Sequence, residues 1–221
     1  MNNIEFCDIA KRYVKTQNIY VMGGWGQTLT EANIKTFVRN YPYNHDRYAI
    51  LKAHEGFIAM DCSGLVKCIL WGNVPGEWKA SSYNKFGIPD INANTMETRC
   101  RDRQGTPVAG DLVWMPGHIG IYVGNGKVVE STPRWNNGIQ LTDLKDRDWK
   151  KVLINCFINY VNEGEEYLQE PEVKIYYSVQ KGDNLTKIAK NCKIPYKDLV
   201  KLNPQIKDVN KIYPGDKIRI K

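Results

Sequence analysis

The sequence predicts an α+β fold in which a helix that carries a cysteine packs on an antiparallel sheet that carries a histidine, with a smaller unit following. Three observations support this prediction. An apolar helical pattern begins after a small polar cluster at residue 61, strand-like apolar segments alternate with turns over residues 110–158, and the charge of the chain changes near residue 172. Cys62 lies in the first feature and His118 in the second.

The composition is that of a globular protein with room for a core. The 221 residues are 42% apolar and 11% aromatic, which suits one domain and a smaller one. No apolar run approaches the roughly 18 residues that a membrane-spanning helix needs. Residues 1–11 also carry two acidic side chains, so we expect neither a signal peptide nor a membrane anchor.

The six cysteines show no C-x-x-C pair and no regular spacing. This pattern favours neither a zinc site nor a disulfide framework, so we expect mostly free thiols and no metal or cofactor. The cysteines other than Cys62 that follow the first helix are interpreted as small buried apolar residues: Cys68, Cys100, Cys156 and Cys192.

The excess positive charge is confined to the C-terminal part of the chain. Residues 172–221 hold 12 Lys and Arg against 5 Asp and Glu, a net charge of +7, whereas residues 1–171 hold 19 of each. A basic module of this kind favours an anionic partner, either nucleic acid or a polymer such as a bacterial cell wall.

The first 57 residues predict a helix, a strand and a segment to which no chemistry can be assigned. Residues 4–15 place apolar side chains on one stripe, which predicts an amphipathic helix. Residues 20–25 predict a short strand that runs into two glycines, where backbones can approach closely or the chain simply turns. Residues 27–57 are polar and aromatic, with a helical pattern near residues 29–38.

The stretch over residues 61–71 predicts a buried helix with a reactive start. Asp61 suits the N-cap, because its carboxylate can accept hydrogen bonds from the free N–H groups of the first turn. Cys62 then lies at the positive end of the helix dipole, where a thiolate is stabilised and the thiol pKa is expected to fall. This placement favours a nucleophile, and the alternative is a small apolar residue at a helix start.

Strands are predicted in the second half of this region. Residues 72–105 are rich in Gly, Pro and Asn and predict loops around one short helix. Four strands are then predicted, at residues 110–114, 118–123, 127–131 and 152–158. Asn125-Gly126 is a strong hairpin signal between the second strand and the third.

The register of this hairpin decides whether Glu130 lies beside His118. A turn of two residues places Glu130 opposite Ile121, on the face away from His118. A turn of three residues places Glu130 opposite Gly120, on the face of His118, with open space expected above the glycine.

We predict the three-residue turn, residues 124–126, in which Val123 pairs with Lys127 and a glycine takes the left-handed conformation. This register also gathers apolar side chains on the opposite, buried face, namely Ile119, Ile121 and Val129.

Four segments carry a family resemblance. They are Tyr20-Val-Met-Gly-Gly24, Asp61-Cys-Ser-Gly-Leu-Val66, Gly110-Asp-Leu-Val-Trp114 and His118-Ile-Gly-Ile-Tyr-Val-Gly124. In this order they resemble the NlpC-type cell-wall cysteine peptidases, a papain-like family, and the resemblance covers residues 1 to about 160. It implies a papain-like fold and hydrolysis of stem-peptide bonds in peptidoglycan, commonly the bond between D-glutamate and a diamino acid.

The resemblance implies a role for each matched residue. Cys62 would be the nucleophile, His118 the base and Glu130 the residue that orients the histidine. Tyr20 matches the tyrosine that lies beside the nucleophile. We expect the oxyanion to be held by the Cys62 backbone N–H with Tyr20 as second donor, and no metal is required.

Asp61 and Ser63 flank the nucleophile. In some family members such residues hold a free amine of the stem peptide, which makes both candidates for substrate binding. Capping of the helix and formation of its first turn are the alternative role.

Two features depart from the family pattern. The third catalytic position is more often His, Asn or Gln, so Glu130 is closer to the Cys-His-Glu arrangement of the related CHAP amidases. The 36 residues between Gly24 and Asp61 are more than the family usually has, so residues 27–57 are interpreted as an insertion. An N-acetylmuramoyl-L-alanine amidase of CHAP-like type is therefore an alternative function, and a catalytically silent wall-binding protein is another.

Residues 177–189, 199–206 and 212–220 resemble the segments of a LysM module. This small βααβ unit binds glycans that contain N-acetylglucosamine. The sugar groove of that family corresponds here to two loops, and the candidate binding residues are Gly182, Asp183, Asn184, Leu185, Thr186, Pro204 and Ile206.

We therefore predict a papain-like catalytic domain over residues 1–161, an acidic linker over residues 162–173 and a LysM domain over residues 174–221. The expected partner is peptidoglycan, with stem peptides at the first domain and glycan at the second. The chain is expected to be a monomer without a nucleic-acid or membrane partner. A wall hydrolase with a wall anchor and no export signal is similar to phage endolysins, which are made in the cytoplasm and act on the bacterial cell wall.

Overall fold

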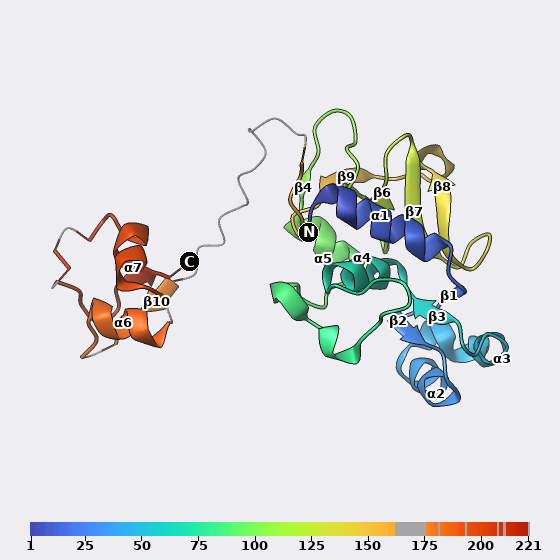
Figure 1. The fold of residues 1–221 in the computed structure, drawn as a ribbon, viewed down its shortest axis with the longest axis horizontal. Coiled ribbons are helices and arrows are strands. Elements are labelled where there is room, and N and C mark those ends of the chain that lie inside the picture. Colours follow the sequence, from blue (N-terminus) through green and yellow to red (C-terminus); the bar gives the residue numbers. More distant parts are fainter. Residues whose placement is uncertain (162–175, 181, 193, 207, 210, 221) are drawn as a thin grey trace. The chain divides into compact units, whose positions relative to one another are not determined.

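The computed structural model describes residues 1–161, 176–180, 182–192, 194–206, 208–209 and 211–220. The chain divides into two compact units, Met1–Leu168 and Gln169–Lys221 (Figure 1). The predicted linker lies outside the described residues, and the predicted domain bounds at residues 161 and 174 stay predictions. In the described ranges no helix is long and apolar enough to cross a lipid bilayer.

A six-stranded sheet forms the centre of the first unit. Its strands lie in the order β4-β9-β5-β6-β7-β8, and every pair of neighbours is antiparallel, as predicted. The four predicted strands correspond to β5, β6, β7 and β9, so β4 and β8 are additions. The bounds are β4 (Arg101–Asp102), β5 (Leu112–Met115), β6 (His118–Tyr122), β7 (Lys127–Thr132), β8 (Gly138–Asp143) and β9 (Lys151–Ile154).

The hydrophobic pattern does not predict strand β8, because an apolar side chain of this strand is exposed and two polar side chains are buried. Leu141 is 49% exposed, whereas Gln140 and Thr142 on either side of it are buried. Gln140 is paired with buried Glu130 across the strands, and Thr142 donates a hydrogen bond to the Glu130 carboxylate. Polar side chains are stable in this position because their hydrogen-bond partners are buried with them.

Two helices cover one face of this sheet. Helix α1 (Asn3–Val14), predicted over residues 4–15, packs on β6, β7 and β8, and α4 (Cys62–Leu70) packs on β6, β7 and α1. Figure 1 shows α1 running across the strands. The predicted packing of the cysteine-bearing helix on the histidine-bearing sheet is thus confirmed. The shared core includes Phe6, Tyr13, Leu65, Ile69, Leu112, Ile119, Ile121 and Val129.

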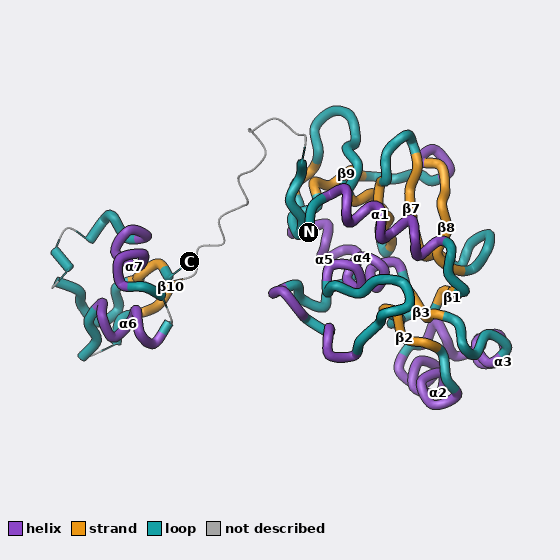
Figure 2. The backbone as a smooth tube through the Cα atoms, viewed as in Figure 1, coloured by secondary structure: helices purple, strands orange, loops and turns teal. Residues whose placement is uncertain are grey.

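The predicted insertion, residues 27–57, packs on a three-stranded sheet with the order β1-β3-β2, whose strands lie mostly outside it. Figure 2 shows its helices α2 and α3 beyond this small sheet, on the side away from the six-stranded sheet. The insertion and this sheet share a separate core, made of Ile19, Val21, Leu29, Ile34, Phe37, Leu51 and Ala59. The elements are β1 (Asn18–Tyr20), β2 (Trp25–Thr28), α2 (Glu31–Asn40), η1 (Pro42–Arg47), α3 (Tyr48–Lys52) and β3 (Ile58–Met60).

The segment between α4 and β5 is mostly irregular, as predicted. It contains the short 3-10 helices η2 (Ala80–Ser82) and η3 (Lys85–Gly87) and one α-helix, α5 (Ala93–Arg99); a further 3-10 helix, η4 (Leu144–Asp146), follows β8. The first turn of α5 contacts the residue before β6, because Asn94 Oδ1 accepts a hydrogen bond from Gly117 N–H at 2.8 Å.

The described part of the second unit has the predicted βααβ order. Strands β10 (Tyr176–Ser178) and β11 (Lys217–Arg219) pair antiparallel, and helices α6 (Leu185–Asn191) and α7 (Tyr196–Leu202) lie between them in the chain. Its core consists of Val179, Leu185, Ile188, Ala189, Leu199 and Ile218.

Candidate active site

Helix α4 begins where two glycines allow backbone to contact backbone. A Cβ atom on Gly64 would lie 1.9 Å from the Gly24 carbonyl oxygen, and one on Gly24 would lie 2.7 Å from the Ala59 carbonyl carbon. A larger side chain at position 64 would push α4 away from Gly24, and one at position 24 would push that residue away from the backbone of β3. The Gly24 carbonyl also accepts a hydrogen bond from Asp61 N–H at 2.9 Å. The close approach predicted for the paired glycines is therefore confirmed.

Asp61 caps α4, as predicted. Its Oδ1 accepts hydrogen bonds from Gly64 N–H at 2.5 Å and Ser63 Oγ at 3.1 Å, and its Oδ2 accepts one from Gly23 N–H at 2.8 Å. Burial raises the pKa of the Asp61 carboxyl, and Lys67 and these hydrogen bonds offset only part of the increase. Asp61 and Ser63 thus stabilise the helix start, and their role in substrate binding stays a prediction.

Cys62 is the first residue of α4 and is only 7% exposed. Its thiol donates a hydrogen bond to the Gly117 carbonyl oxygen at 4.0 Å. Burial, and then the nearby Asp61 carboxylate, raise the pKa of the thiol to about 12, although backbone N–H groups at the helix start lower it. The prediction of a lowered thiol pKa is therefore wrong, because desolvation outweighs the helix dipole at this position.

The hairpin between β6 and β7 has the predicted three-residue turn. Ile121 pairs with Val129, and Val123 N–H donates to the Lys127 carbonyl at 2.9 Å. Asn125 has a φ of 52°, and the glycines on either side of it also have positive φ. The turn therefore depends on residue types that tolerate the left-handed region.

His118 and Glu130 share one face of the sheet in this register. Nε2 of His118 lies 2.6 Å from Oε2 of Glu130, and the two side chains are 12% and 0% exposed. The open space predicted above Gly120 is wrong. A Cβ atom on Gly120 would lie 2.6 Å from Val128 Cγ1 and 3.3 Å from the Trp149 ring, so these two side chains fill the space.

The Glu130 carboxylate is bound by three side chains, those of His118, Thr142 and Arg147. Thr142 Oγ1 donates to Oε1 at 2.7 Å, Arg147 Nε donates to Oε1 at 3.1 Å, and Arg147 Nη2 lies 2.7 Å from Oε2. Burial by itself raises the pKa of Glu130, but the hydrogen bonds from His118, Arg147 and Thr142 outweigh it and hold the pKa below its ordinary value. The carboxylate therefore stays ionised and can accept the imidazole N–H.

Trp149 fixes the plane of the histidine ring. The ring centroids of His118 and Trp149 are 5.5 Å apart and the rings are inclined by 13°. The Arg147 guanidinium lies over the rings of Trp149 and Trp135, at 5.9 Å and 4.9 Å from their centroids. One stacking contact and one hydrogen bond together leave the imidazole a single orientation.

The start of β6 connects Cys62 to His118. Gly117, whose carbonyl accepts the Cys62 hydrogen bond, directly precedes His118 in the chain, and Ile119 N–H on its other side lowers the thiol pKa. With Nε2 bound to Glu130, Nδ1 is the imidazole nitrogen left for the thiol. The thiol is hydrogen-bonded to the Gly117 carbonyl and not to the imidazole. Hydrogen bonds between a thiol and a base commonly shorten when substrate binds.

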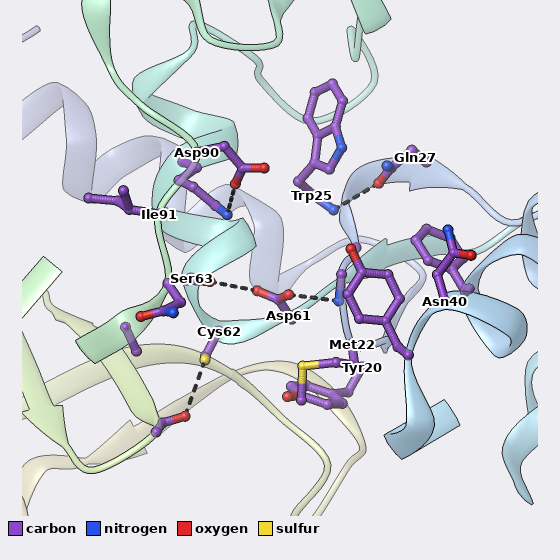
Figure 3. A pocket seen from close by; sticks show the side chains of 18 of the residues that line it. Tyr20, Met22, Trp25, Gln27, Asn40, Asp61, Cys62, Ser63, Asp90 and Ile91 are labelled. Carbon is purple, nitrogen blue, oxygen red and sulfur yellow. Dashed lines mark hydrogen bonds and ion pairs between the residues drawn. The ribbon is translucent and has the colours of Figure 1, made fainter. Parts of the chain in front are cut away.

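Cys62 lies in the wall of a groove with a volume of about 650 Å³. Figure 3 shows Cys62 and Tyr20 towards one end of this groove and Asp90 and Trp25 towards the other. The insertion forms part of the wall, through Thr36, Phe37, Asn40 and Tyr41. The segment before α5 forms another part, through Tyr83, Asp90, Ile91 and Asn92.

A charged cluster lies in this groove. Lys67 forms an ion pair with Asp90, and its side chain is only 10% exposed. Tyr83 donates a hydrogen bond to Asp90 Oδ2 at 2.7 Å. Tyr41 lines the same groove, and burial, and then the charges of Asp61 and Asp90, raise the pKa of its hydroxyl. The groove therefore offers a substrate both donors and acceptors.

Tyr20 lies in the groove beside Cys62, as predicted (Figure 3). Burial, and then the nearby Cys62 and Asp61, raise the pKa of Tyr20, so its hydroxyl remains a donor. Its ring packs edge-on against Tyr43 at 5.7 Å and lies under the Arg47 guanidinium at 5.8 Å. The insertion thus holds a residue of the site in place.

Three predicted glycan-binding side chains of the second unit have internal roles. Asp183 accepts a hydrogen bond from Gln180 N–H at 2.8 Å, and Asn184 caps α6 by accepting one from Lys187 N–H at 2.9 Å. Leu185 is 2% exposed and belongs to the core. These side chains stabilise the loop and the helix that follows it.

The other four predicted residues are accessible. Gly182, Thr186 and Pro204 are exposed, and Ile206 is half-buried. Ile206 also lines a depression of about 540 Å³ together with residues that include Tyr213. Their role in glycan binding stays a prediction.

Several residues of the site escape prediction from sequence. Arg147 and Thr142 bind Glu130, but they lie beyond the predicted strands and contact it only through the order of the sheet. No feature of the sequence points to them, because Glu130 is predicted on the face opposite the buried one, where a carboxylate needs no buried cation. The sequence also does not predict that Tyr41 and Lys67 line one groove, since nothing in it places the insertion against α4.

Comparison with known proteins assigns both parts of the chain. Residues 19–157 match the NlpC/P60 family, and residues 177–221 match the LysM domain. The endolysin of Bacillus phage B103 is 49% identical over 45 residues, which are 20% of this chain and 17% of that protein. The bifunctional muramidase/DL-endopeptidase CwlT of Bacillus subtilis (strain 168) is 32% identical over 111 residues, which are 43% of this chain and 27% of that protein.

The matches therefore span less than a third of the length of these relatives. Among solved structures, NlpC1 from Trichomonas vaginalis is 15% identical, with a TM-score of 0.41, over 68% of this chain and 42% of that one. The match to the family covers more than half of the chain and includes Cys62, His118 and Glu130. On this ground the chain belongs to the NlpC/P60 family, with a LysM domain in its C-terminal part.

Proposed function

We propose that this protein is a peptidoglycan hydrolase, a cysteine endopeptidase that cleaves stem-peptide amide bonds with Cys62, His118 and Glu130. The observation that carries the proposal is the His118–Glu130 pair, which directly follows Gly117, the residue that accepts the hydrogen bond of the Cys62 thiol. Cys62 and Gly117 both line the groove. Family membership supports thiol chemistry. The names of two relatives, an endolysin and a muramidase/DL-endopeptidase, support the cell wall as the substrate.

The first step is removal of the thiol proton. Because the pKa of Cys62 is raised to about 12, the thiol is protonated at neutral pH. A protonated thiol is a poor nucleophile, so His118 accepts the proton through Nδ1 while the sulfur attacks the peptide carbonyl. This order of events is favoured over a thiolate–imidazolium pair that exists before substrate binds.

The later steps use the same groups. His118 gives the proton to the leaving amine, and a thioester remains on Cys62. Water then attacks the thioester with His118 again as the base. Glu130 accepts a hydrogen bond from the Nε2–H group and so fixes the tautomer in which Nδ1 faces the thiol. Arg147 is a positioning residue, because it acts through the Glu130 carboxylate.

The oxyanion is stabilised by two donors in this proposal. The Cys62 N–H belongs to the first turn of α4, where backbone N–H groups have no carbonyl partner within the helix. The Tyr20 hydroxyl is the second donor, since it lines the groove beside Cys62 and its raised pKa keeps it protonated.

The bond cleaved is proposed to be the one between D-glutamate and the diamino acid of the stem peptide. A groove of about 650 Å³ accommodates a short peptide. The Tyr41 hydroxyl and the Lys67–Asp90 pair offer donors and acceptors to its carbonyl and amide groups. The LysM domain holds the enzyme on the glycan, with Thr186 and Ile206 as accessible candidates for sugar contact.

A second candidate function is that of an N-acetylmuramoyl-L-alanine amidase. The observation that favours it is the carboxylate at the third catalytic position, Glu130, which the CHAP amidases share. The chemistry at Cys62 is the same in both cases, and only the amide bond presented to the thiol differs. A catalytically silent wall-binding protein is the remaining alternative.

Release of soluble fragments from dyed, purified peptidoglycan tests the proposal. The wild type should release dye, and Cys62→Ala and His118→Ala should reduce the rate by at least about 10³-fold. Both variants should still bind chitin oligomers, because binding depends on the other unit. Dye release by Cys62→Ala at the wild-type rate would contradict the mechanism, and binding without release by the wild type would support the silent alternative.

A further inference from the structure

Two cysteines outside the groove lie in contact through their sulfur atoms. Sγ of Cys100 and Sγ of Cys156 are 2.7 Å apart, and Cys156 N–H donates to Cys100 Sγ at 3.4 Å. Heavy atoms that are not bonded rest roughly 3.5–4 Å apart, and a disulfide bond is about 2.05 Å long. The contact is therefore closer than ordinary packing of two thiols.

The sheet itself brings these cysteines together. Cys100 follows α5 and directly precedes β4, and Cys156 lies two residues beyond the end of β9. Strands β4 and β9 are antiparallel neighbours in which Arg101 pairs with Ile154. This register continues to Cys100 opposite Asn155, so Cys156 is the next residue along and lies diagonally across from Cys100. The pairing of β4 with β9 therefore brings the two cysteines together.

The two thiols differ in access and in acidity. Cys100 is 7% exposed, whereas Cys156 is half-buried. The hydrogen bond between them lowers the pKa of Cys156 and, together with burial, raises the pKa of Cys100. Cys156 therefore has the thiolate character and the access that reaction with a small oxidant requires, and Cys100 is placed to complete the exchange.

We propose that Cys100 and Cys156 form a disulfide when the protein meets an oxidising environment, and that this bond links the end of α5 to the β9 side of the sheet. The pair lies outside the groove, and the chemistry proposed for Cys62 does not use it. The proposal replaces the prediction that both cysteines are only small buried apolar residues.

A small disulfide such as glutathione disulfide is the oxidant in this reaction. The Cys156 thiolate attacks one of its sulfurs, which forms a mixed disulfide and releases one small thiol. Cys100 loses its proton and attacks the Cys156 sulfur, which forms the protein disulfide and releases the second small thiol. Two protein thiols and one small disulfide thus become one protein disulfide and two small thiols.

The bond would stabilise the part of the first unit that carries the catalytic histidine. It closes a loop from residue 100 to residue 156 that contains β4 to β9, and disulfides that close long loops restrict the unfolded chain most. It also holds α5, whose Asn94 accepts the hydrogen bond from Gly117 N–H beside His118. We expect the Tm of the first unit to rise by roughly 5–15 °C on oxidation.

The experiment uses the full chain incubated with glutathione disulfide, followed by intact mass, peptide mapping and thermal unfolding. The expected result is the loss of two hydrogen atoms, a cross-linked peptide that contains Cys100 and Cys156, and a rise in Tm that dithiothreitol reverses. Cys100→Ser and Cys156→Ser should abolish both the cross-link and the rise. Cys192→Ser, which removes another half-buried thiol, is the matched control and should retain both.

Two results would overturn the proposal. One is persistence of free thiols at both positions after incubation, and the other is a stable glutathione adduct on Cys156 that Cys100 does not displace. The wild-type measurement decides between these results and the expected one even where a serine variant fails to fold.

Discussion

Nε2 of His118 lies 2.6 Å from Oε2 of Glu130, on one face of a sheet where both side chains are largely shielded from water. This contact depends on a single residue of hairpin register, since a turn shorter by one residue would point Glu130 to the opposite face. The same carboxylate is bound by Arg147 and Thr142, so it is ionised and its position is fixed. The pair is therefore arranged to orient an imidazole.

Replacement Glu130→Gln tests this orientation. An amide side chain can donate as well as accept, so it no longer selects the tautomer in which Nδ1 faces the thiol. We expect kcat to fall by about 10²–10⁴-fold with little change in KM. Steady-state hydrolysis of a soluble stem peptide measures both constants. Circular dichroism serves as the control for folding, and a kcat within twofold of wild type in a folded variant would show that Glu130 has no orienting role.

Replacement Arg147→Met tests whether the buried cation supports the buried carboxylate. The two side chains are 6% and 0% exposed, so loss of Arg147 leaves an uncompensated charge and should lower the free energy of unfolding by about 3–5 kcal/mol. Lys127→Met is the matched control, because its ion pair with Asp143 is exposed and should contribute less than about 1 kcal/mol. Urea unfolding of both variants at neutral pH gives the comparison, and equal losses would contradict the account.

The same variant should change the dependence of stability on pH. The pKa of Glu130 is lowered by folding, so its contribution is complete above the ordinary value of 4.5 and is lost as pH falls through the lower folded value. Without Arg147 the folded pKa rises, and acid unfolding should begin at a higher pH than in the wild type. Acid titration followed by tryptophan fluorescence measures this midpoint.

Alkylation of Cys62 tests its protonation state. Since the pKa of the thiol is raised to about 12, the thiolate fraction grows about tenfold with each pH unit from pH 7 to pH 9. The rate of modification by iodoacetamide, followed at Cys62 by peptide mapping, should rise accordingly without a plateau. Cys156, whose pKa is lowered, should react faster at pH 7 and serves as the internal reference. A plateau for Cys62 below pH 8 would indicate a thiolate already present in the free enzyme.

Replacement Tyr41→Phe tests whether the insertion contacts the substrate. Tyr41 lines the groove together with Asp61 and Asp90, so loss of one hydrogen bond to substrate should raise KM by about 2–10-fold with kcat nearly unchanged. Tyr48→Phe is the matched control, because Tyr48 lies in the same insertion, is 37% exposed and does not line the groove. Identical kinetics for Tyr41→Phe and wild type would exclude this contact.

Features set by local sequence could be predicted. The cap at Asp61, the helix that starts at Cys62 and the turn over residues 124–126 each depend on neighbouring residues whose preferences agree. The register that joins His118 to Glu130 followed because the same turn also buried an apolar face. Here turn chemistry and hydrophobic pattern pointed to one arrangement.

Features set by the order of the sheet or by burial could not be predicted. Arg147 reaches Glu130 only because the chain returns past β7 after β8, and Cys100 meets Cys156 only because β4 pairs with β9. The thiol pKa of Cys62 depends on the depth of burial, which a helix position does not reveal. Such properties arise from contacts between residues far apart in the chain.

Mass spectrometry of fragments from purified peptidoglycan tests whether Cys62 hydrolyses a stem-peptide bond. Digests by the wild type and by Cys62→Ala are compared. We expect new free amines on the diamino acid, paired with new carboxyl groups on D-glutamate, in the wild-type digest alone. Lactyl groups freed of L-alanine would show an amidase instead, and fragments that do not depend on Cys62, or no fragments at all, would rule out hydrolysis by this thiol.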